Sequence, residues 1–375
     1  MTIKEITSKS ILRKSKKVDS WFISRYGMNL YRGCQHNCIY CDGRTEKYQV
    51  EGEFGTDISV KVNAIDILKK ELDPQRKRKP FKKGFIILGG GVGDSYQPVE
   101  KKYKLCRQAL QLIYKYNYPV HILTKSNLVK RDIDILKKIN ERKKAIISFS
   151  FSSVDGKISE IFEPGVPSPS QRLETISFFK KQGFTCGMFL MPVIPFITDS
   201  FERIYEYIKK AKEIGVDFII FSGMTLKEGK QKDYFINILK EKYPDKLVEY
   251  NHIYRKEPFG GIIPEYCKSI HQTFYNIIKK EKVPSRIPSK FFKDYIDEND
   301  LVIVILEHID YLLKLRGLKS SIGYVAYSLS KLDKPLSDMK YDLRKIRGIG
   351  LQTQKIIFEI LDTGTSKYYE KLLFN

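Results

Sequence analysis

The chain is poor in the residues that build disulfide frameworks and membrane spans. It has six cysteines, five histidines and one tryptophan among 375 residues. No apolar run reaches the roughly 18 residues that a membrane helix needs, and the basic N-terminus lacks the apolar core of a signal peptide. We therefore expect a cytoplasmic protein with reduced thiols and no membrane contact.

Acidic residues are also scarce relative to basic ones. The chain has 67 Lys and Arg against 44 Asp and Glu, which gives a formal net charge of +23. Such an excess favours a polyanionic partner through counterion release, with nucleic acid as the first candidate. A lysine-rich surface that only keeps the protein soluble is the alternative.

Length and composition indicate a globular protein with more than one domain. Apolar residues make up 42% and charged residues 30% of the chain, as in soluble proteins. A chain of this length accommodates one large core and a small one. We expect a basic N-terminal segment over residues 1–25, a barrel domain over 26–297 and a helical domain over 298–375.

Short apolar runs alternate with segments of helical spacing in the first two thirds of the chain. This alternation predicts an α/β fold with a parallel sheet, a partial (β/α)6 barrel of the TIM type. The basic run 73–84 is expected at the end opposite the chemistry, which in such barrels sits on loops at the carboxyl ends of the strands. The expected strands cover 28–31, 85–88, 119–123, 145–151, 185–190 and 216–221, and the expected helices cover 61–72, 100–117, 131–140, 171–182 and 201–214.

Three of the six cysteines, Cys34, Cys38 and Cys41, fall within eight positions of the stretch YRGCQHNCIYCDGR. Three thiolates can bind one metal centre, but they leave a tetrahedral site one ligand short. A [4Fe–4S] cluster needs one ligand per iron, so three cysteines leave one iron open. His36, inside the loop, is the alternative fourth ligand and would complete a zinc site.

The spacing Cys-x3-Cys-x2-Cys, with Tyr40 before the last cysteine, resembles the radical S-adenosylmethionine (radical SAM) superfamily. Four further stretches resemble its spore photoproduct lyase-like branch: GDSYQPVE, ILTKSNLVKRDIDIL, IFEPGVPSPSQRLE and PVIPFITD. The resemblance implies a [4Fe–4S] cluster on Cys34, Cys38 and Cys41, with S-adenosylmethionine bound at the open iron. It also implies an electron donor such as flavodoxin or ferredoxin.

The same resemblance assigns residues to the cofactor. Tyr40 would lie near the adenine, and Lys125 would reach the methionine carboxylate. Ser150 would hydrogen-bond the cofactor. The backbone would pass close to the methionine moiety at three glycines, which have no Cβ to prevent a close approach: Gly89, Gly90 and Gly91.

One departure from the family concerns the reaction. Spore photoproduct lyases carry a hydrogen-donating cysteine in the loop after the second strand, where this chain has Gly91. Cys106 and Cys186 are the alternative donors, although an isolated cysteine is more often a small buried hydrophobe. Asp94 and Tyr96, on the same loop, are expected to face the substrate as catalytic residues.

A second motif, LRKIRGIGLQTQKIIFEIL, has the form helix, Ile-x-Gly-Ile-Gly, helix. Its glycines allow a tight turn and let the second helix direct its first N–H groups at a phosphate. With its flanks, the segment 305–375 resembles the N-terminal DNA-binding domain of family X DNA polymerases, a small all-α helix-hairpin-helix domain. The resemblance implies DNA contacts by Lys345, Arg347, Gly348, Gly350 and Lys355.

Residues 301–375 carry 12 Lys and Arg and 8 Asp and Glu, so their net charge of +4 leaves +19 for the rest of the chain. The barrel itself is therefore expected to contact a polyanion. The interpretation that joins both motifs is a radical SAM enzyme that acts on a nucleotide in DNA, in lyase-like repair or in modification. The alternatives are an RNA- or tRNA-modifying enzyme and a non-catalytic iron–sulfur sensor that binds DNA.

Overall fold

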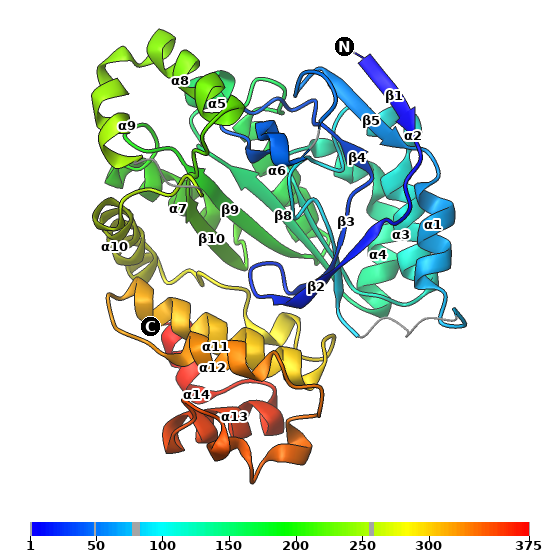
Figure 1. Cartoon of the computed structure of the whole chain (residues 1–375), viewed down its shortest axis with the longest axis vertical. Helices are drawn as coiled ribbons and strands as arrows, with labels where there is room; N and C mark the ends of the chain where they lie inside the picture. The colour runs from blue at the N-terminus through cyan, green and yellow to red at the C-terminus, as the bar shows by residue number, and fades with distance from the viewer. Residues whose placement is uncertain (1, 49, 77–82, 255–258, 375) are drawn as a thin grey trace.

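The computed structural model describes residues 2–48, 50–76, 83–254 and 259–374. A curved seven-stranded sheet forms its centre, in the order β10-β9-β8-β7-β6-β3-β2. All neighbours pair in parallel except the edge strand β2, which pairs antiparallel with β3 (Figure 1). The strands of this sheet are β2 (Leu12–Asp19), β3 (Ser24–Met28), β6 (Phe85–Leu88), β7 (Val120–Thr124), β8 (Ala145–Phe151), β9 (Thr185–Val193) and β10 (Phe218–Gly223).

The expected α/β fold is confirmed, and the first expected strand is placed differently. It was expected at 28–31, but β3 covers Ser24–Met28 and ends where the expected strand begins. The chain then leaves this sheet and forms β4 (Tyr31–Arg32), which pairs with β5 (Asp57–Lys61).

The first 25 residues take part in both sheets. β1 (Thr2–Ile6) pairs in parallel with β5, and β2 extends the main sheet beyond β3. The segment that was expected to lie outside the barrel therefore supplies one edge of it. Of the basic run 73–84, residues 77–82 lie outside the described part of the chain.

Helices cover the outer face of the sheet, and their amphipathic sequences explain their positions. The expected helix 100–117 is interrupted at Lys104, whose φ of 51° is left-handed and cannot continue a helix. The expected helix 131–140 begins later, after a 3-10 helix over Asn127–Asp132. These helices are α1 (Ala64–Leu72), α2 (Glu100–Tyr103), α3 (Leu105–Lys115), α4 (Ile133–Arg142), α5 (Gly156–Phe162), α6 (Pro169–Lys181) and α7 (Phe201–Ile214).

In the described residues, the α-helices that follow β10 are α8 (Lys230–Lys242), α9 (Leu247–Ile253) and α10 (Pro264–Glu281). The C-terminal unit, which lies below the sheet in Figure 1, is made up of the α-helices α11 (Glu298–Leu315), α12 (Ile322–Leu329), α13 (Leu351–Thr363) and α14 (Lys367–Phe374). In the described ranges, no helix is long and apolar enough to span a membrane.

The C-terminal unit shares a hydrophobic core with the barrel. Leu306 of α11 belongs to the same buried cluster as Phe85, Ile146 and Phe218, which lie at or next to the first residues of β6, β8 and β10. α11 also packs against β2. The unit therefore covers the amino-terminal ends of the strands, opposite the ends where catalytic loops are expected.

The first helix of the expected hairpin is absent. Residues Leu343–Lys345 form only a 3-10 turn, and α13 begins directly after Gly350. Leu343 is the single buried residue of this turn, so the segment has no apolar stripe that would stabilise a longer helix against the core.

We predict that the shared core makes α11 essential for the stability of the barrel. Leu306 is fully buried, so Leu306→Ala should lower the free energy of unfolding by about 2–5 kcal/mol. Leu318→Ala is the matched control, because Leu318 is 53% exposed and should change stability by less than about 0.5 kcal/mol. Urea unfolding measures both. Equally small losses of stability in the two variants would contradict a core that the barrel and the C-terminal unit share.

Candidate functional site

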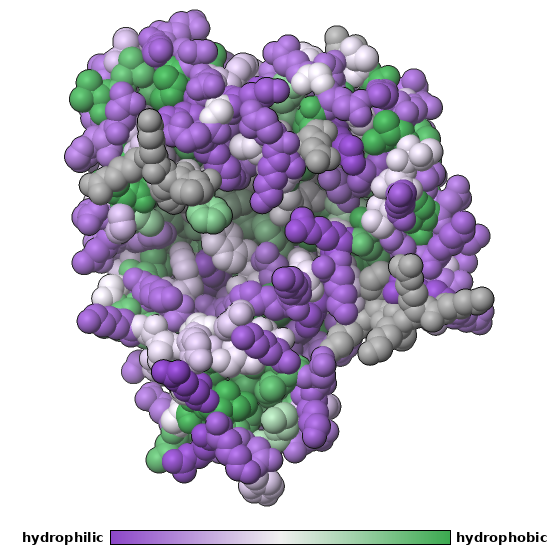
Figure 2. All heavy atoms as spheres, in the orientation of Figure 1, coloured by the Kyte–Doolittle hydropathy of each residue, from purple (hydrophilic) through white to green (hydrophobic). Residues whose placement is uncertain are grey.

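The loop after β4 brings its three cysteines to one cavity. Cys34, Cys38 and Cys41 line a space of about 510 Å³ at the carboxyl ends of the strands. The backbone N–H of Asp94 donates a hydrogen bond to Cys34 Sγ at 3.3 Å, and that of Gly43 donates to Cys41 Sγ at 3.4 Å. Figure 2 shows a hollow on this face of the molecule, rimmed by hydrophilic residues.

The three thiols can serve as ligands of a metal centre. Burial raises the pKa of each of them, to about 12 for Cys38, and a metal centre would hold them as thiolates. A [4Fe–4S] cluster takes one ligand per iron, so the three cysteines would supply three of its four ligands.

His36 is not available as a fourth ligand. Its Nδ1 lies 2.9 Å from the carbonyl oxygen of Gly165, and its Nε2 lies 3.1 Å from a carboxylate oxygen of Asp94. The ring is also nearly fully buried. Both nitrogens already have partners, which argues against the zinc alternative.

The expected cofactor residues Tyr40, Lys125 and Ser150 line the same cavity. Lys125 Nζ donates to Ser150 Oγ at 2.5 Å and lies 3.6 Å from a carboxylate oxygen of Glu163. The hydroxyl of Tyr40 donates to that same carboxylate. One buried carboxylate therefore fixes both a cationic and an aromatic side chain in the cavity.

Glu163 is held in turn by Arg172 of α6. Arg172 Nη2 donates to the second carboxylate oxygen of Glu163 at 2.6 Å, and Nη1 donates to the backbone carbonyl of Ser150 at 2.8 Å. Both side chains are fully buried. Burial alone would raise the pKa of Glu163, but Arg172 and Lys125 reverse the effect and lower it to about 2. The carboxylate is therefore ionised at neutral pH.

In the glycine loop after β6, three of the four glycines lie where another residue would be strained or would clash. Gly89 and Gly93 have positive φ values of 85° and 88°, and a Cβ on Gly89 would lie 2.0 Å from the carbonyl oxygen of Leu123. A Cβ on Gly90 would lie 2.7 Å from Ile87. All three expected glycines, Gly89 to Gly91, line the cavity, where bare backbone permits a ligand to approach closely.

The two residues expected to face a substrate have structural partners. Tyr96 is fully buried, does not line the cavity and donates to Asp132 at 3.1 Å, and its catalytic role stays a prediction. Asp94 lines the cavity, but it accepts hydrogen bonds from Thr124 Oγ1 at 2.8 Å and the Lys125 N–H at 2.7 Å, besides its contact with His36. Burial raises the pKa of Asp94, but His36 and the backbone N–H groups of Lys125 and Tyr96 reverse the effect and lower it. Asp94 joins three loops and has no free position for proton transfer.

Neither alternative hydrogen donor reaches the cavity. Cys106 is fully buried, and its Sγ donates to the carbonyl oxygen of Ser95 at 3.0 Å. Cys186 is also fully buried, within β9. Neither cysteine lines the cavity.

Sequence reasoning missed several residues that line or support the cavity. Glu163 and Arg172 lie within a stretch that was used only for the resemblance. Ser222 and Gly223 end the last parallel strand, so reading the loop after β10 by the barrel rule would have found them. Nothing in the sequence indicated that Asp19 and Phe22 line the cavity, because the turn between β2 and β3 was expected to lie outside the barrel.

The expected nucleic-acid contacts lie on the C-terminal unit. Gly348 has a φ of 94°, and Gly350 immediately precedes α13 with open space around it. Arg347 and Lys355 are exposed. Lys345 is also exposed and forms an ion pair with Asp342 at 2.6 Å.

We predict a stability effect of Glu163 that depends on pH. Because its folded pKa lies below its ordinary value, its contribution is complete above about pH 5 and disappears as the pH falls toward 2. Glu163→Gln leaves Arg172 buried without a charged partner and should lower the free energy of unfolding by about 3–5 kcal/mol at pH 7. The gap to the wild type should narrow in acid.

Urea unfolding at several pH values measures this effect. Glu160→Gln is the matched control, because it removes the same charge from an exposed position on α5. A deficit of Glu163→Gln that did not change with pH would contradict an ionised Glu163.

Comparison with known proteins supports this assignment of the site. A family model described as the radical SAM superfamily matches residues 28–208. An uncharacterized protein of Methanocaldococcus jannaschii is 30% identical over 248 residues, which cover 66% of this chain and 86% of that protein. An uncharacterized protein of Mycobacterium tuberculosis is 27% identical over 287 residues, which cover 76% of this chain and 82% of that protein.

Solved structures share the fold. A spore photoproduct lyase mutant has a TM-score of 0.55 at 18% identity, over 74% of this chain and 79% of that one. A second mutant of that lyase, with bound AdoMet and dinucleoside spore photoproduct, has a TM-score of 0.52 at 19% identity and the same coverage. The family match and the cysteine loop that it contains show that residues 28–208 form a radical SAM domain, and members of this superfamily use a [4Fe–4S] cluster and S-adenosylmethionine.

Proposed function

We propose that the protein is a radical SAM enzyme that acts on a nucleotide in DNA, in repair or modification, in the cytoplasm. The observation that carries the enzymatic part is that Cys34, Cys38, Cys41, Lys125 and the glycine loop line one cavity. When bound, the cluster and S-adenosylmethionine supply a 5′-deoxyadenosyl radical, with an electron from a donor such as flavodoxin or ferredoxin.

The chain's own residues hold and orient the cofactor. The three cysteines would bind the cluster. Ser150 and Glu163 fix the ammonium group of Lys125. Lys125 would therefore bind the methionine carboxylate of S-adenosylmethionine. Glu163 also fixes Tyr40, whose ring lies beside Lys125. The distance from Lys125 Nζ to the centroid of the Tyr40 ring is 5.9 Å.

The choice of DNA rests on charge and on the C-terminal unit. A net charge of +23 favours a polyanion. Gly350, at the start of α13, leaves the first N–H groups of a 13-residue helix accessible to a phosphate. Fold likeness to spore photoproduct lyase adds weight, since one of its structures holds a dinucleoside spore photoproduct.

The enzymatic part is tested by reductive cleavage of S-adenosylmethionine. Reconstituted wild-type protein should form 5′-deoxyadenosine under reducing, anaerobic conditions, and Cys34→Ala should lower formation to background because one iron ligand is lost. Cys267→Ala is the control and should retain activity, since Cys267 does not line the cavity. Undiminished activity in Cys34→Ala would refute the assignment.

The DNA-binding part is tested by salt dependence. Arg347→Gln combined with Lys355→Gln should reduce the slope of log affinity against log salt by about 2, since each lost phosphate contact reduces it by about 1. The control combines Lys367→Gln with Lys371→Gln, which removes the same charge from α14. Fluorescence anisotropy with labelled duplex DNA, with tRNA as competitor, measures the slopes. Equal slopes in the two variants would argue against DNA contacts by Arg347 and Lys355. Stronger binding of tRNA than of DNA would favour RNA as the substrate.

A further inference from the structure

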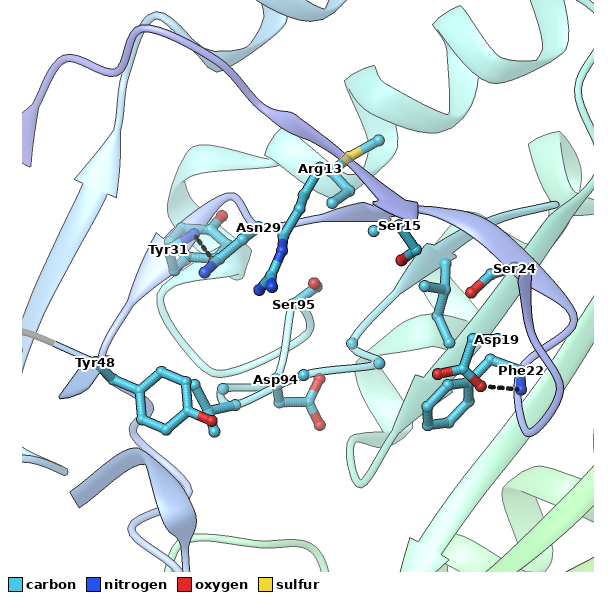
Figure 3. A pocket seen from close by; sticks show the side chains of 18 of the residues that line it. Arg13, Ser15, Asp19, Phe22, Ser24, Asn29, Tyr31, Tyr48, Asp94 and Ser95 are labelled. Carbon is cyan, nitrogen blue, oxygen red and sulfur yellow. Dashed lines mark hydrogen bonds between the residues drawn. The ribbon is translucent and has the colours of Figure 1, made fainter. Parts of the chain in front are cut away.

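A second cavity adjoins the cofactor cavity along the glycine loop. It has a volume of about 290 Å³ and shares Asp19, Phe22, Tyr48 and the loop Gly89–Asp94 with the cofactor cavity. The rest of its wall comes largely from β2, β3 and the residues that follow them (Figure 3). A molecule in this space would therefore lie next to the cofactor, with the glycine loop as their common wall.

Arg13 is the basic side chain of this second cavity. The register of the edge strand sets Arg13 opposite Gly27 of β3, and the missing side chain of Gly27 leaves room in the cavity. A Cβ added there would meet only Ile87, at 4.0 Å. Figure 3 shows Arg13 reaching from β2 into the space between Asn29 and Ser95.

The Arg13 guanidinium has no ion pair and no hydrogen bond within the described ranges. The two carboxylates of the cavity are engaged elsewhere. Asp19 accepts from the N–H groups of Trp21 at 2.8 Å and Phe22 at 3.2 Å, and Asp94 is held by the donors described above. A cation without an internal partner thus faces a cavity in which Asp94 and one carboxylate oxygen of Asp19 are already engaged by hydrogen bonds.

The other groups at this wall can also donate hydrogen bonds. Ser15 follows Arg13 at the same face of β2, because alternate residues of a strand share a face. The hydroxyls of Ser15 and Ser95 line the cavity without hydrogen-bond partners among the described residues. An arginine with two hydroxyls is a donor set that suits phosphate, since guanidinium can donate two parallel hydrogen bonds to it.

We propose that this cavity binds a phosphate of the nucleic-acid backbone, with Arg13 as its main ligand and Ser15 and Ser95 as further donors. The inference rests on the proposed function and deepens it, because it states which part of the substrate is held beside the radical source. A phosphate fixed on Arg13 positions the adjoining nucleotide across the glycine loop, within the cofactor cavity.

Lys14 provides a matched control for the test. It neighbours Arg13 on β2, carries the same charge and is exposed like Arg13, but it pairs in register with Tyr26 and lines neither cavity. Gly27→Leu is a second variant, which fills the cavity without changing the charge. Thermal melting of each purified, cluster-loaded variant establishes that it is folded.

The experiment measures binding of a short fluorescent single-stranded DNA, and of RNA with the same sequence, at about 100 mM salt. We expect Arg13→Gln and Gly27→Leu to weaken DNA binding about 10–100-fold, as for the loss of a charge-assisted hydrogen bond. The DNA affinity of Lys14→Gln should stay within about threefold of the wild-type affinity, because the variant loses one screened surface charge.

Each outcome decides one part of the proposal. Equal losses in Arg13→Gln and Lys14→Gln would overturn the phosphate site, since only overall charge would then matter. Tighter binding of RNA with the same dependence on Arg13 would support the site and overturn DNA as the substrate. Wild-type protein that binds neither nucleic acid would overturn the proposed substrate, and with it this site.

Discussion

The buried carboxylate of Asp94 is the interaction on which the site depends. Three loops that follow different strands meet at this group. Its side chain accepts from Thr124 and from the backbone of Lys125, and it contacts His36 of the cysteine loop, while its own N–H donates to Cys34. A charge without solvent is costly unless it is fully hydrogen-bonded, so these loops are held in one arrangement. The cysteines and the lysine are thus positioned before any ligand binds.

The sequence predicted the fold well where hydrophobic periodicity is strong. β6 and β8 appear at the predicted residues, because their apolar runs are bounded by clear breaks. The edge strand β2 was not predicted, since half of the side chains in LRKSKKVD are basic and the segment has no apolar alternation. Pairing with β3 and packing against α11 make a strand of this segment, and neither contact can be predicted from its local sequence.

Some residues of the candidate site could be predicted from the sequence and others could not. Residues in a compact motif, such as the cysteines, were predicted because the spacing of the motif indicates the chemistry. Glu163 and Arg172 were missed because they act through other side chains, and a buried ion pair has no local pattern. For Tyr96, the place in the loop did not give the direction of the side chain, whose hydroxyl donates to Asp132 in the interior.

Gly91 has a consequence for how this protein can change. Of the four glycines in its loop, it alone combines an ordinary φ with open space around an added Cβ. At the other three a side chain would clash with the Leu123 carbonyl (Gly89), press on the Ile87 side chain (Gly90) or require a left-handed backbone (Gly89 and Gly93). A substitution at Gly91 would place a new group at the common wall of both cavities with little cost to folding. The loop is thus constrained as a scaffold but open at one point, where evolution or design could alter the chemistry and keep the architecture.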